Sequence, residues 1–367
     1  GGERAWVHSM QEYDSGTLPE IVATARRRWS QADAAQEDWR NEASEAYDFV
    51  AGMQLDEETR AMYEEKLRPI VAFNFTAKYI DAIAGLQINN RQDINFLPRN
   101  TGDSPQTDVA NESVSFFRDE SDATDEESDA FYDLLCTGMG WTETFMDYEM
   151  DPDGMIVTER RDPAQMRWDP RARKRNLRDA RWVMRGKPMS HEEMVERWPD
   201  KEDEFGAPDD LAVDLDDDEM GIHDNTLAPW YESGNNSQDG GQEKPTTVLE
   251  MQYYKVENYM RVVTIINGER KEADVAWKNW NSKFKPFMEK NGVQYQAKKI
   301  KKRTYYRSFS VGSVLLEEGK SPCQSGFTYK CMTGKRDRNQ KCWYGLFRAL
   351  KDPQLWTNKL LSQLMHV

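Results

Sequence analysis

Two groups of acidic residues carry the carboxylates that bind metal ions. Carboxylates alternate through residues 147–153 like the first ligands of a calcium loop, but the later spacing lacks the Glu that closes such a loop. Asp151–Gly154 is instead typical of a turn between two strands. Asp214–Glu219 could supply the ligands of a two-metal nuclease. It lies within residues 200–246, whose Asp, Gly, Pro, Asn and Gln content is typical of a surface loop that could not hold metal ions at fixed distances.

Cysteine and histidine chemistry is weakly indicated. The chain has four Cys and four His, but no CxxC pair, so the closely spaced ligands of a zinc site are missing. The even cysteine count allows two disulfides, although nothing suggests secretion. The sequence has no Walker loop, nucleophile elbow, HExxH motif or dinucleotide fingerprint. We therefore expect no enzyme, metal or cofactor, and keep a metal-dependent nucleic-acid enzyme (a nuclease or a packaging ATPase component) as the alternative.

A run of cations stands out in the strand-like segment Gln294–Leu316. The run consists of Lys298, Lys299, Lys301, Lys302 and Arg303. Because successive side chains of a strand point to opposite faces, both faces would be basic and both would be exposed. Such a run suits contact with an acidic partner or with DNA. It equally suits a solvated edge strand that lysines protect from aggregation, and both interpretations stay open.

Charge is divided unevenly along the chain. The net charge is -16, yet residues 251–367 hold 23 basic and 9 acidic residues, whereas residues 1–250 hold 26 and 56. This split favours different roles for the two parts. The mean hydropathy of -0.89 is low for one compact core and suits an elongated subunit, or one that buries surface on assembly. No apolar run approaches the ~20 residues that span a bilayer, so we expect no membrane segment.

The first half of the chain reads mainly as helices. Residues 17–67 have an apolar stripe at helical spacing, interrupted after Val50 and ending before Pro69. Further helices are expected at Asn74–Ile88, Thr107–Arg118 and Asp122–Thr137, with a short strand at Asp93–Pro98. From Gly138 the pattern changes to strands, at Trp141–Tyr148, Met155–Arg161 and Arg181–Gly186. Ser190 and Glu193 then form a capping box that opens a short helix.

The second half returns to strands over Val248–Ile266, with a turn at Asn267-Gly268. Apolar positions from Ala273 to Met288 predict an amphipathic helix, kinked near Pro286. Asp352-Pro353 suits the N-cap and first position of a final helix. Its apolar stripe comprises Trp356, Leu360, Leu361, Leu364 and Met365. The sequence stops inside this pattern, so we expect the C-terminus to be incomplete.

Four motifs, in order, resemble those of podovirus-type portal proteins of tailed bacteriophages. The first is a helix ending near a glycine, followed by an Asn-Arg pair and a short strand. The second is a glycine-rich entry into a hairpin, the third a strand reaching Asp-Pro and then Asp-Ala, and the fourth a helix with Gln and Asn one turn apart. They correspond to Ile83–Leu86 with Asn89–Ile94 and Pro98, to Thr137–Trp141, to Asp162-Pro163, Trp168–Pro170 and Asp179-Ala180, and to Gly345–Arg348 with Asp352–Gln354 and Asn358-Lys359.

The resemblance implies an α+β portal fold: a mixed helix/strand wing, stem helices and a small α/β clip. By analogy, the wing takes residues 1–270 with an acidic loop near 200–246, a stem helix takes 271–292, the clip 293–333, and a second, truncated stem segment 334–367. Portals of this family form dodecameric rings, so subunit packing is expected at the stem. The expected packing residues are Trp277, Trp280, Phe284, Trp356 and Leu360, with an ordinary core inside one chain as the equal alternative for the first three.

The implied function is structural. Such a ring forms the DNA channel at the portal vertex of the capsid and serves genome packaging and ejection. The clip would dock the terminase motor and later a tail adaptor protein, which gives Lys298–Arg303 a motor, adaptor or DNA contact. Double-stranded DNA, the major capsid protein and scaffolding protein are the other implied partners. The implied location is the virion, with assembly in the host cytoplasm.

Overall fold

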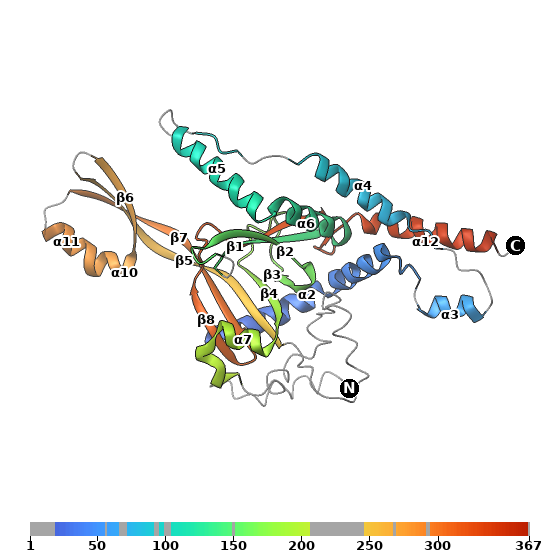
Figure 1. Cartoon of the computed structure of the whole chain (residues 1–367). Coiled ribbons are helices and arrows are strands. Elements are labelled where there is room, and N and C mark those ends of the chain that lie inside the picture. The colour runs from blue at the N-terminus through green and yellow to red at the C-terminus, as the bar shows by residue number, and fades with distance from the viewer. Residues whose placement is uncertain are drawn as a thin grey trace.

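The computed structural model describes residues 19–55, 57–65, 72–91, 95–98, 104–148, 151–205, 246–266, 269–290 and 294–365. Helices and sheets are both abundant, and every strand pairing is antiparallel, which confirms the expected α+β class. A body of helices and sheets occupies the centre, and a narrow projection leaves it on one side (Figure 1). Among the described helices, none is both long and apolar enough to cross a bilayer.

Helix α2 (Glu20–Ala51) is one continuous helix and forms the spine of the body. Its buried stripe includes Trp29, Trp39 and Phe49 at helical spacing. The helix ends at Gly52, whose φ of 107° lies in the left-handed region that glycine adopts without strain. The sequence predicts an interruption after Val50, and the helix ends one residue later, at Ala51.

The other helices of the first half are α3 (Glu57–Glu65), α4 (Phe75–Asn89), α5 (Ser104–Glu120) and α6 (Ala123–Thr137). The helices expected at Thr107–Arg118 and Asp122–Thr137 are confirmed as α5 and α6. The strand expected at Asp93–Pro98 is not: residues 95–98 form none, and residues 93–94 lie outside the described part. The amide side chain of Asn111 takes the place of a neighbouring strand, because it accepts from the Phe96 N–H at 2.7 Å and donates to its carbonyl at 3.3 Å.

A first sheet has the order β2-β1-β9. β1 (Met139–Asp147) and β2 (Met155–Arg161) form the expected hairpin, and β9 (Tyr329–Thr333) pairs with the other edge of β1. The backbone N–H of Asp153 donates to the Asp151 side chain within the hairpin turn, which supports the turn interpretation of this acidic stretch.

A second sheet has the order β3-β4-β5-β7-β8, with β6 beside the far end of β5. Its strands are β3 (Met166–Trp168), β4 (Trp182–Met189), β5 (Thr246–Ile266), β6 (Glu269–Ala276), β7 (Tyr295–Val311) and β8 (Val314–Lys320). Between them lie the short helices η1 (Pro163–Gln165), α7 (His191–Arg197) and η2 (Pro199–Glu204). The Ser190–Glu193 capping box opens α7 as predicted. A small hairpin of β10 (Lys335–Arg336) and β11 (Trp343–Tyr344) follows.

The body core lies where α2 crosses both sheets. In one cluster the Trp39 and Trp168 rings meet edge to face at 5.1 Å, and Trp141 packs on Trp168 at 5.9 Å. A second cluster packs α2 against β4 and β5, and a third packs α7 against β5, β7 and β8. These aromatic contacts hold α2 between the sheets, since each large ring removes much apolar surface from water.

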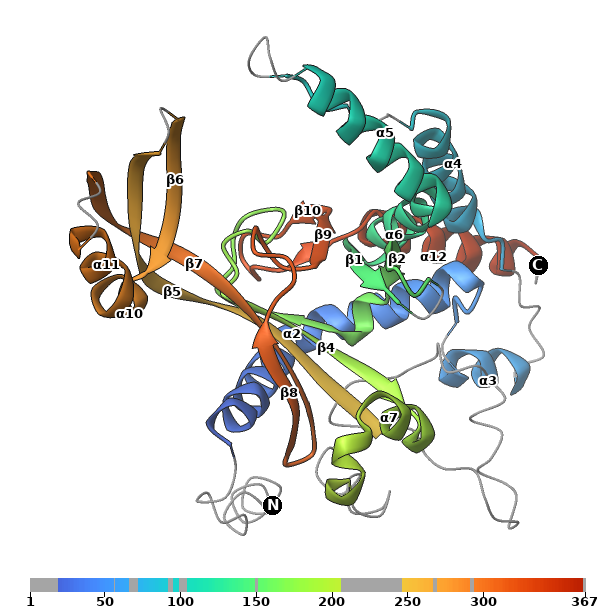
Figure 2. The same cartoon turned by 60° about the vertical axis from the view of Figure 1, so that its left-hand side comes forward.

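The projection is built by the far halves of β5 and β7, by β6, and by a helical segment between β6 and β7 (Figure 2). That segment comprises α10 (Trp277–Asn279), a π-helical turn η4 (Trp280–Phe284) and α11 (Lys285–Lys290). The helix expected from Ala273 is therefore wrong at its start, because residues up to Ala276 pair with β5 as strand β6. A π-helical turn precedes Pro286, whose ring nitrogen cannot donate the backbone hydrogen bond of a regular helix.

Helix α12 (Phe347–Leu364) begins five residues before the predicted N-cap Asp352, and Pro353 lies inside it. Contacts with α2 hold the extra turn. Phe347 packs edge to face on Phe49 at 5.3 Å, Arg348 forms an ion pair with Glu42, and Lys351 forms one with Glu45. This packing offsets the backbone hydrogen bond that Pro353 cannot make.

Candidate functional site

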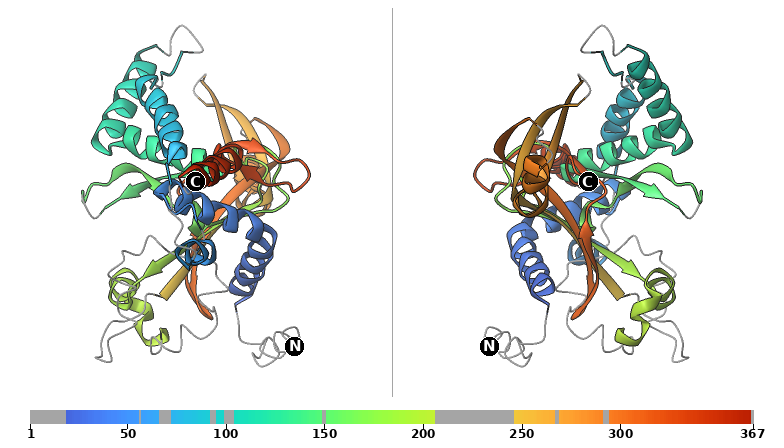
Figure 3. Two further views of the ribbon diagram at one scale, coloured as in Figure 1. Left: turned by 90° about the vertical axis from the view of Figure 1, so that its right-hand side faces the viewer. Right: turned by 90° about the vertical axis from the view of Figure 1, so that its left-hand side faces the viewer.

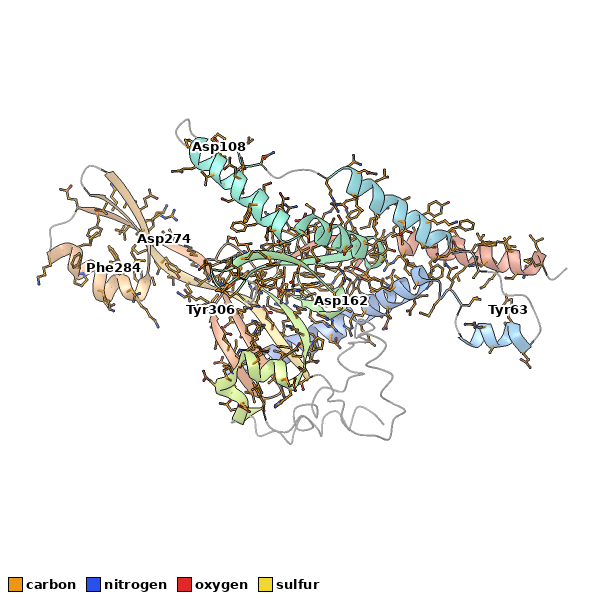
Figure 4. The ribbon with its side chains drawn as sticks, viewed as in Figure 1. Tyr63, Asp108, Asp162, Asp274, Phe284 and Tyr306 are labelled. Carbon is orange, nitrogen blue, oxygen red and sulfur yellow. The ribbon has the colours of Figure 1, made fainter. Side chains whose placement is uncertain are left out.

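The projection has a small core of its own. Trp280 is only 4% exposed, and its ring meets Tyr295 edge to face at 5.3 Å. Trp277 is half-buried, whereas Phe284 on the same helical segment is 46% exposed (Figure 4). The structure thus brings the three expected packing residues into one segment. Trp280 is used inside the chain, and Phe284 keeps an apolar surface open.

The basic run lies on β7 within the projection. Its cations pair in register with the residues of β5 from Arg261 to Val256. The other edge of β7 is unpaired there among the described strands, because β8 pairs only with residues 306–311. The run therefore lies on an edge strand, and its lysines and arginine are exposed.

Aromatic rings lie close to three of these cations, with Lys302 at 5.7 Å from the centre of the Tyr259 ring. The Lys299 ammonium lies 4.6 Å from the centre of the Trp277 ring, and the Arg303 guanidinium lies 4.5 Å from that of Tyr254. Lys302 forms a 3.6 Å ion pair with Asp274. Cation–ring contacts hold a charged group near the surface without neutralising it. The run therefore presents positive charge along one edge of the projection.

Polar residues, and not the predicted apolar stripe, face the body from α12. Gln354 and Asn358 are buried, with their side-chain oxygens accepting from the backbone N–H groups of Phe75 and Phe73 at 3.2 and 3.1 Å. The Asn358 amide also donates to Gln54 at 2.5 Å. These bonds join α12 to the start of α4. The Gln and Asn that carried the sequence resemblance thus connect three segments of the chain.

The apolar stripe of α12 is left open. Trp356 is 64% exposed and Leu360 is 55% exposed. Helix α4, which packs against α12, exposes Tyr79 and Leu86 to a similar degree. We call this set, together with Leu364, the α4/α12 apolar face. The described part of the chain leaves these large apolar side chains uncovered.

A buried group of charges connects the two sheets, and sequence reasoning missed it. Glu143 of β1 accepts from the Arg161 Nε at 2.9 Å, and Glu250 of β5 accepts from the Arg307 Nε at 2.6 Å and from the Tyr329 hydroxyl at 2.7 Å. Glu143 lies 3.8 Å from Arg307 as well. Strand alternation could have revealed it, because Glu143 shares a face with the core residue Trp141.

The electrostatics of this group are those of a satisfied structural network. Burial raises the pKa of Glu143, and the nearby Glu250 adds to the effect, while Arg161 and Arg307 oppose it. Burial alone would also raise the pKa of Glu250, but the charge and hydrogen bond of Arg307 outweigh it and hold that pKa below its ordinary value. Both carboxylates are paired with arginines, as buried charges require. The network therefore joins the sheets and offers no open site for a substrate.

The metal-site alternatives gain no geometric support. Within the described ranges, no group of three or more His, Cys, Asp or Glu side chains could hold a metal ion. Asp214–Glu219 lies outside those ranges. The four cysteines, all of them described, form no disulfide.

Comparison with known proteins identifies one family. The family described as Phage P22-like portal protein matches residues 26–367. No curated protein matches the chain. The match covers nearly all of the chain, including the two motif-bearing helices and the projection. The chain therefore belongs to the Phage P22-like portal protein family, a family of structural proteins, which confirms the resemblance seen in its sequence.

Proposed function

We propose that this portal protein is one of about twelve subunits of a closed ring that forms the DNA channel at the capsid vertex. In this role the ring admits the genome during packaging and releases it during ejection. Terminase docks on the ring first and a tail adaptor protein later, while major capsid and scaffolding proteins surround it. The α4/α12 apolar face is the observation that carries the proposal.

A ring requires that each subunit present two complementary surfaces to its neighbours. The α4/α12 apolar face has the composition of such a surface. Its large side chains are exposed on two helices that pack against each other, and the buried Gln354 and Asn358 of α12 are already used within the chain. Burying Trp356 alone would remove on the order of 100 Å² of apolar area from water, worth a few kcal/mol at ~25 cal/mol per Å².

The projection is the proposed docking end. β6, the helical segment and the facing halves of β5 and β7 form one unit with a shared core, so the proposal assigns residues 255–304 to the clip. This places the stem–clip division earlier than the sequence suggested, since the expected clip 293–333 is shared between the projection, β8 and β9. The exposed cations from Lys298 to Arg303 supply the contact for an acidic patch on terminase or adaptor, or for DNA.

Acidity of the whole subunit suits a passage for DNA. Each phosphate that Lys or Arg neutralises releases counterions and strengthens binding, which would slow movement of the duplex. A chain with net charge -16 instead repels DNA over most of its surface. The proposal therefore needs only a limited number of basic positions along the channel.

Mass photometry of the purified chain tests the proposal. We expect rings of about twelve subunits for the natural chain. Trp356→Glu with Leu360→Glu should shift the mass distribution to monomers, because two carboxylates would have to be buried in the seam. Monomer stability should change by no more than about 0.5 kcal/mol, since both side chains are exposed in the single chain.

Tyr148→Glu is the matched control, because Tyr148 is an equally exposed aromatic residue on the β1–β2 hairpin. Rings that persist in the double variant would contradict the assignment of the α4/α12 apolar face. A natural chain that stays monomeric at high concentration would contradict the ring itself, and metal-dependent cleavage of DNA by the pure protein would favour the enzyme alternative.

A further inference from the structure

Two loops from distant parts of the chain form a second basic surface. One comprises residues 171–178, between β3 and β4, and the other comprises residues 335–341, at the β10–β11 hairpin. One hydrogen bond joins them, from the Arg336 guanidinium to the Arg173 carbonyl at 2.9 Å, and the Thr333 hydroxyl at the end of β9 donates to the Arg175 carbonyl at 2.6 Å. Figure 2 shows the loops side by side near β9. We call them the twin-loop surface.

The twin-loop surface is rich in cations without carboxylate partners. Its basic residues are Arg171, Arg173, Lys174, Arg175, Arg178, Lys335, Arg336, Arg338 and Lys341. Among the described residues no carboxylate lies within ion-pair distance of any of these side chains. Elsewhere in the body, arginines such as Arg40, Arg160 and Arg307 are paired with Asp or Glu. Like charges left together in an otherwise acidic protein repel one another, so their gathering calls for an anionic partner.

Nearby carboxylates accept hydrogen bonds from the backbone of the loops. Asp179 accepts from the backbone N–H groups of Arg173 and Lys174 at 2.7 and 3.1 Å. Partial burial would raise the pKa of Asp179, but these N–H groups outweigh it and hold that pKa below its ordinary value. Asp337 likewise accepts from two N–H groups of its own loop and pairs with Arg348.

Two apolar side chains of the first loop are buried in the core of the body. Leu177 has a φ of 50° and is only 3% exposed, so this residue adopts the left-handed region in order to place its side chain in the core. Ala172 is buried in the same cluster. With its apolar side chains inside, the loop presents only polar groups outward, and it does so with a fixed backbone.

We propose that the twin-loop surface binds the phosphate backbone of double-stranded DNA. Arginine predominates, and its planar fork matches the oxygens of a phosphate. Neither loop contains an aromatic residue, so the loops themselves provide no ring on which single-stranded bases could stack. An apolar centre, typical of contacts with another protein, is absent from the two loops as well.

The acidity of the whole chain does not prevent this contact. Salt screens charges beyond about 10 Å at 0.1 M ionic strength, so the local cations decide the interaction of a nearby phosphate. This inference goes beyond the proposed channel function and does not depend on ring assembly. It concerns body loops that lie apart from the basic run of the projection.

Fluorescence anisotropy with a labelled duplex of about 20 base pairs, two helical turns, tests the inference across a series of KCl concentrations. The variant is Arg173→Gln, Lys174→Gln and Arg175→Gln in the full chain, which keeps the backbone bonds to Asp179. Losing three phosphate contacts should weaken binding and make the plot of log affinity against log salt shallower by ~2.7. The matched control, Lys278→Gln, Lys283→Gln and Lys290→Gln, removes the same charge from exposed lysines of the helical segment and should keep the original slope.

Equal loss in the variant and the control would overturn the inference, because it would show a response to net charge alone. Displacement of the duplex by polyglutamate at equal charge concentration would also overturn it and assign the loops to an acidic protein segment. Mass photometry of each sample separates a failure of binding from a failure of assembly. Should the triple variant unfold, Lys335→Gln with Arg338→Gln on the second loop gives the same test, with an expected slope change of ~1.8.

Discussion

At the junction of α6 and β1, three glycines lie so close to the backbone of neighbouring segments that a side chain would not fit. A Cβ on Gly140 would lie 1.9 Å from the carbonyl oxygen of Ala130, and one on Gly345 would lie 2.4 Å from that of Leu135. Gly138 adds a φ of 88°. Here α6, β1 and the segment after β11 touch through their main chains. The glycine-rich motif at this junction therefore has a steric cause.

Gly140→Ala should destabilise the protein by about 1–3 kcal/mol or more, because the new methyl group meets a backbone oxygen that cannot move alone. Gly85→Ala is the matched control. Gly85 lies inside α4, and a methyl group added there would meet nothing within 4 Å, so alanine should raise stability by up to about 1 kcal/mol. Thermal and urea unfolding of both variants measures this, and equal behaviour would contradict the steric account.

At the residue scale, sequence patterns predicted local hydrogen bonding better than long-range pairing. The Ser190–Glu193 capping box was predictable because both partners lie within one turn. The Glu143 and Glu250 network was not, since its members come from five strands that only the complete fold brings together. The side-chain roles of Gln354 and Asn358 also depend on a distant segment, around Phe73.

Among the elements, the projection is an independent unit joined to the body by two strands. Lys255 of β5 lies directly opposite Thr304 of β7, so the register defines where the projection can be removed. None of the body clusters draws on the residues between these two positions. The body should therefore fold without them.

Replacing residues 256–303 by Asn-Gly should give a hairpin that closes β5 onto β7 in the present register. We expect a soluble protein whose cooperative thermal transition stays within a few degrees of that of the full chain. Trp280→Ala in the full chain is the companion control: it should increase proteolysis of the projection while the body transition is kept. Loss of cooperative unfolding after the excision would show that the body needs the projection.

Helical periodicity and local capping signals predicted the wrong boundary at two elements, for physical reasons. Ala273 and Ala276 fit a helical stripe, but their backbone groups pair with β5, and a strand pairing overrides a weak local preference. The start of α12 was placed at Asp352 because Asp-Pro is a good local opening. Contacts of Phe347 with α2 extend the helix beyond it. Elements whose signals were local, such as the β1–β2 hairpin, were predicted correctly.

Over the whole molecule, the basic residues described above lie in two separate places, on the projection and on the twin-loop surface. The projection, with its basic edge strand, and α5 rise on opposite sides of α12 when the molecule is viewed along its length (Figure 3). The sequence predicted the acidic and basic parts of the chain. It could not place the twin-loop surface, since five of its cations come from the acidic first part and four from the second.

Lys299→Glu with Lys301→Glu should weaken docking of terminase or of the tail adaptor by about tenfold, or about 1.4 kcal/mol, without unfolding the subunit. Both side chains are exposed on the projection, so the folded state loses little. Surface plasmon resonance with each partner measures the effect. Lys278→Glu with Lys283→Glu is the control of equal charge on the helical segment, and unchanged affinity for both partners in the first variant would contradict this assignment.

The 21-residue strand β5 runs without a loop from the third body cluster to the tip of the projection. Together with β7 it forms a continuous ribbon, on the order of 70 Å long at ~3.3 Å per residue, and Tyr306 marks where it enters the body (Figure 4). No hinge interrupts this ribbon within the paired residues of β5 and β7. We therefore expect a force applied at the tip of the projection to bend the ribbon as a whole and to reach the body at the Glu250–Arg307 ion pair.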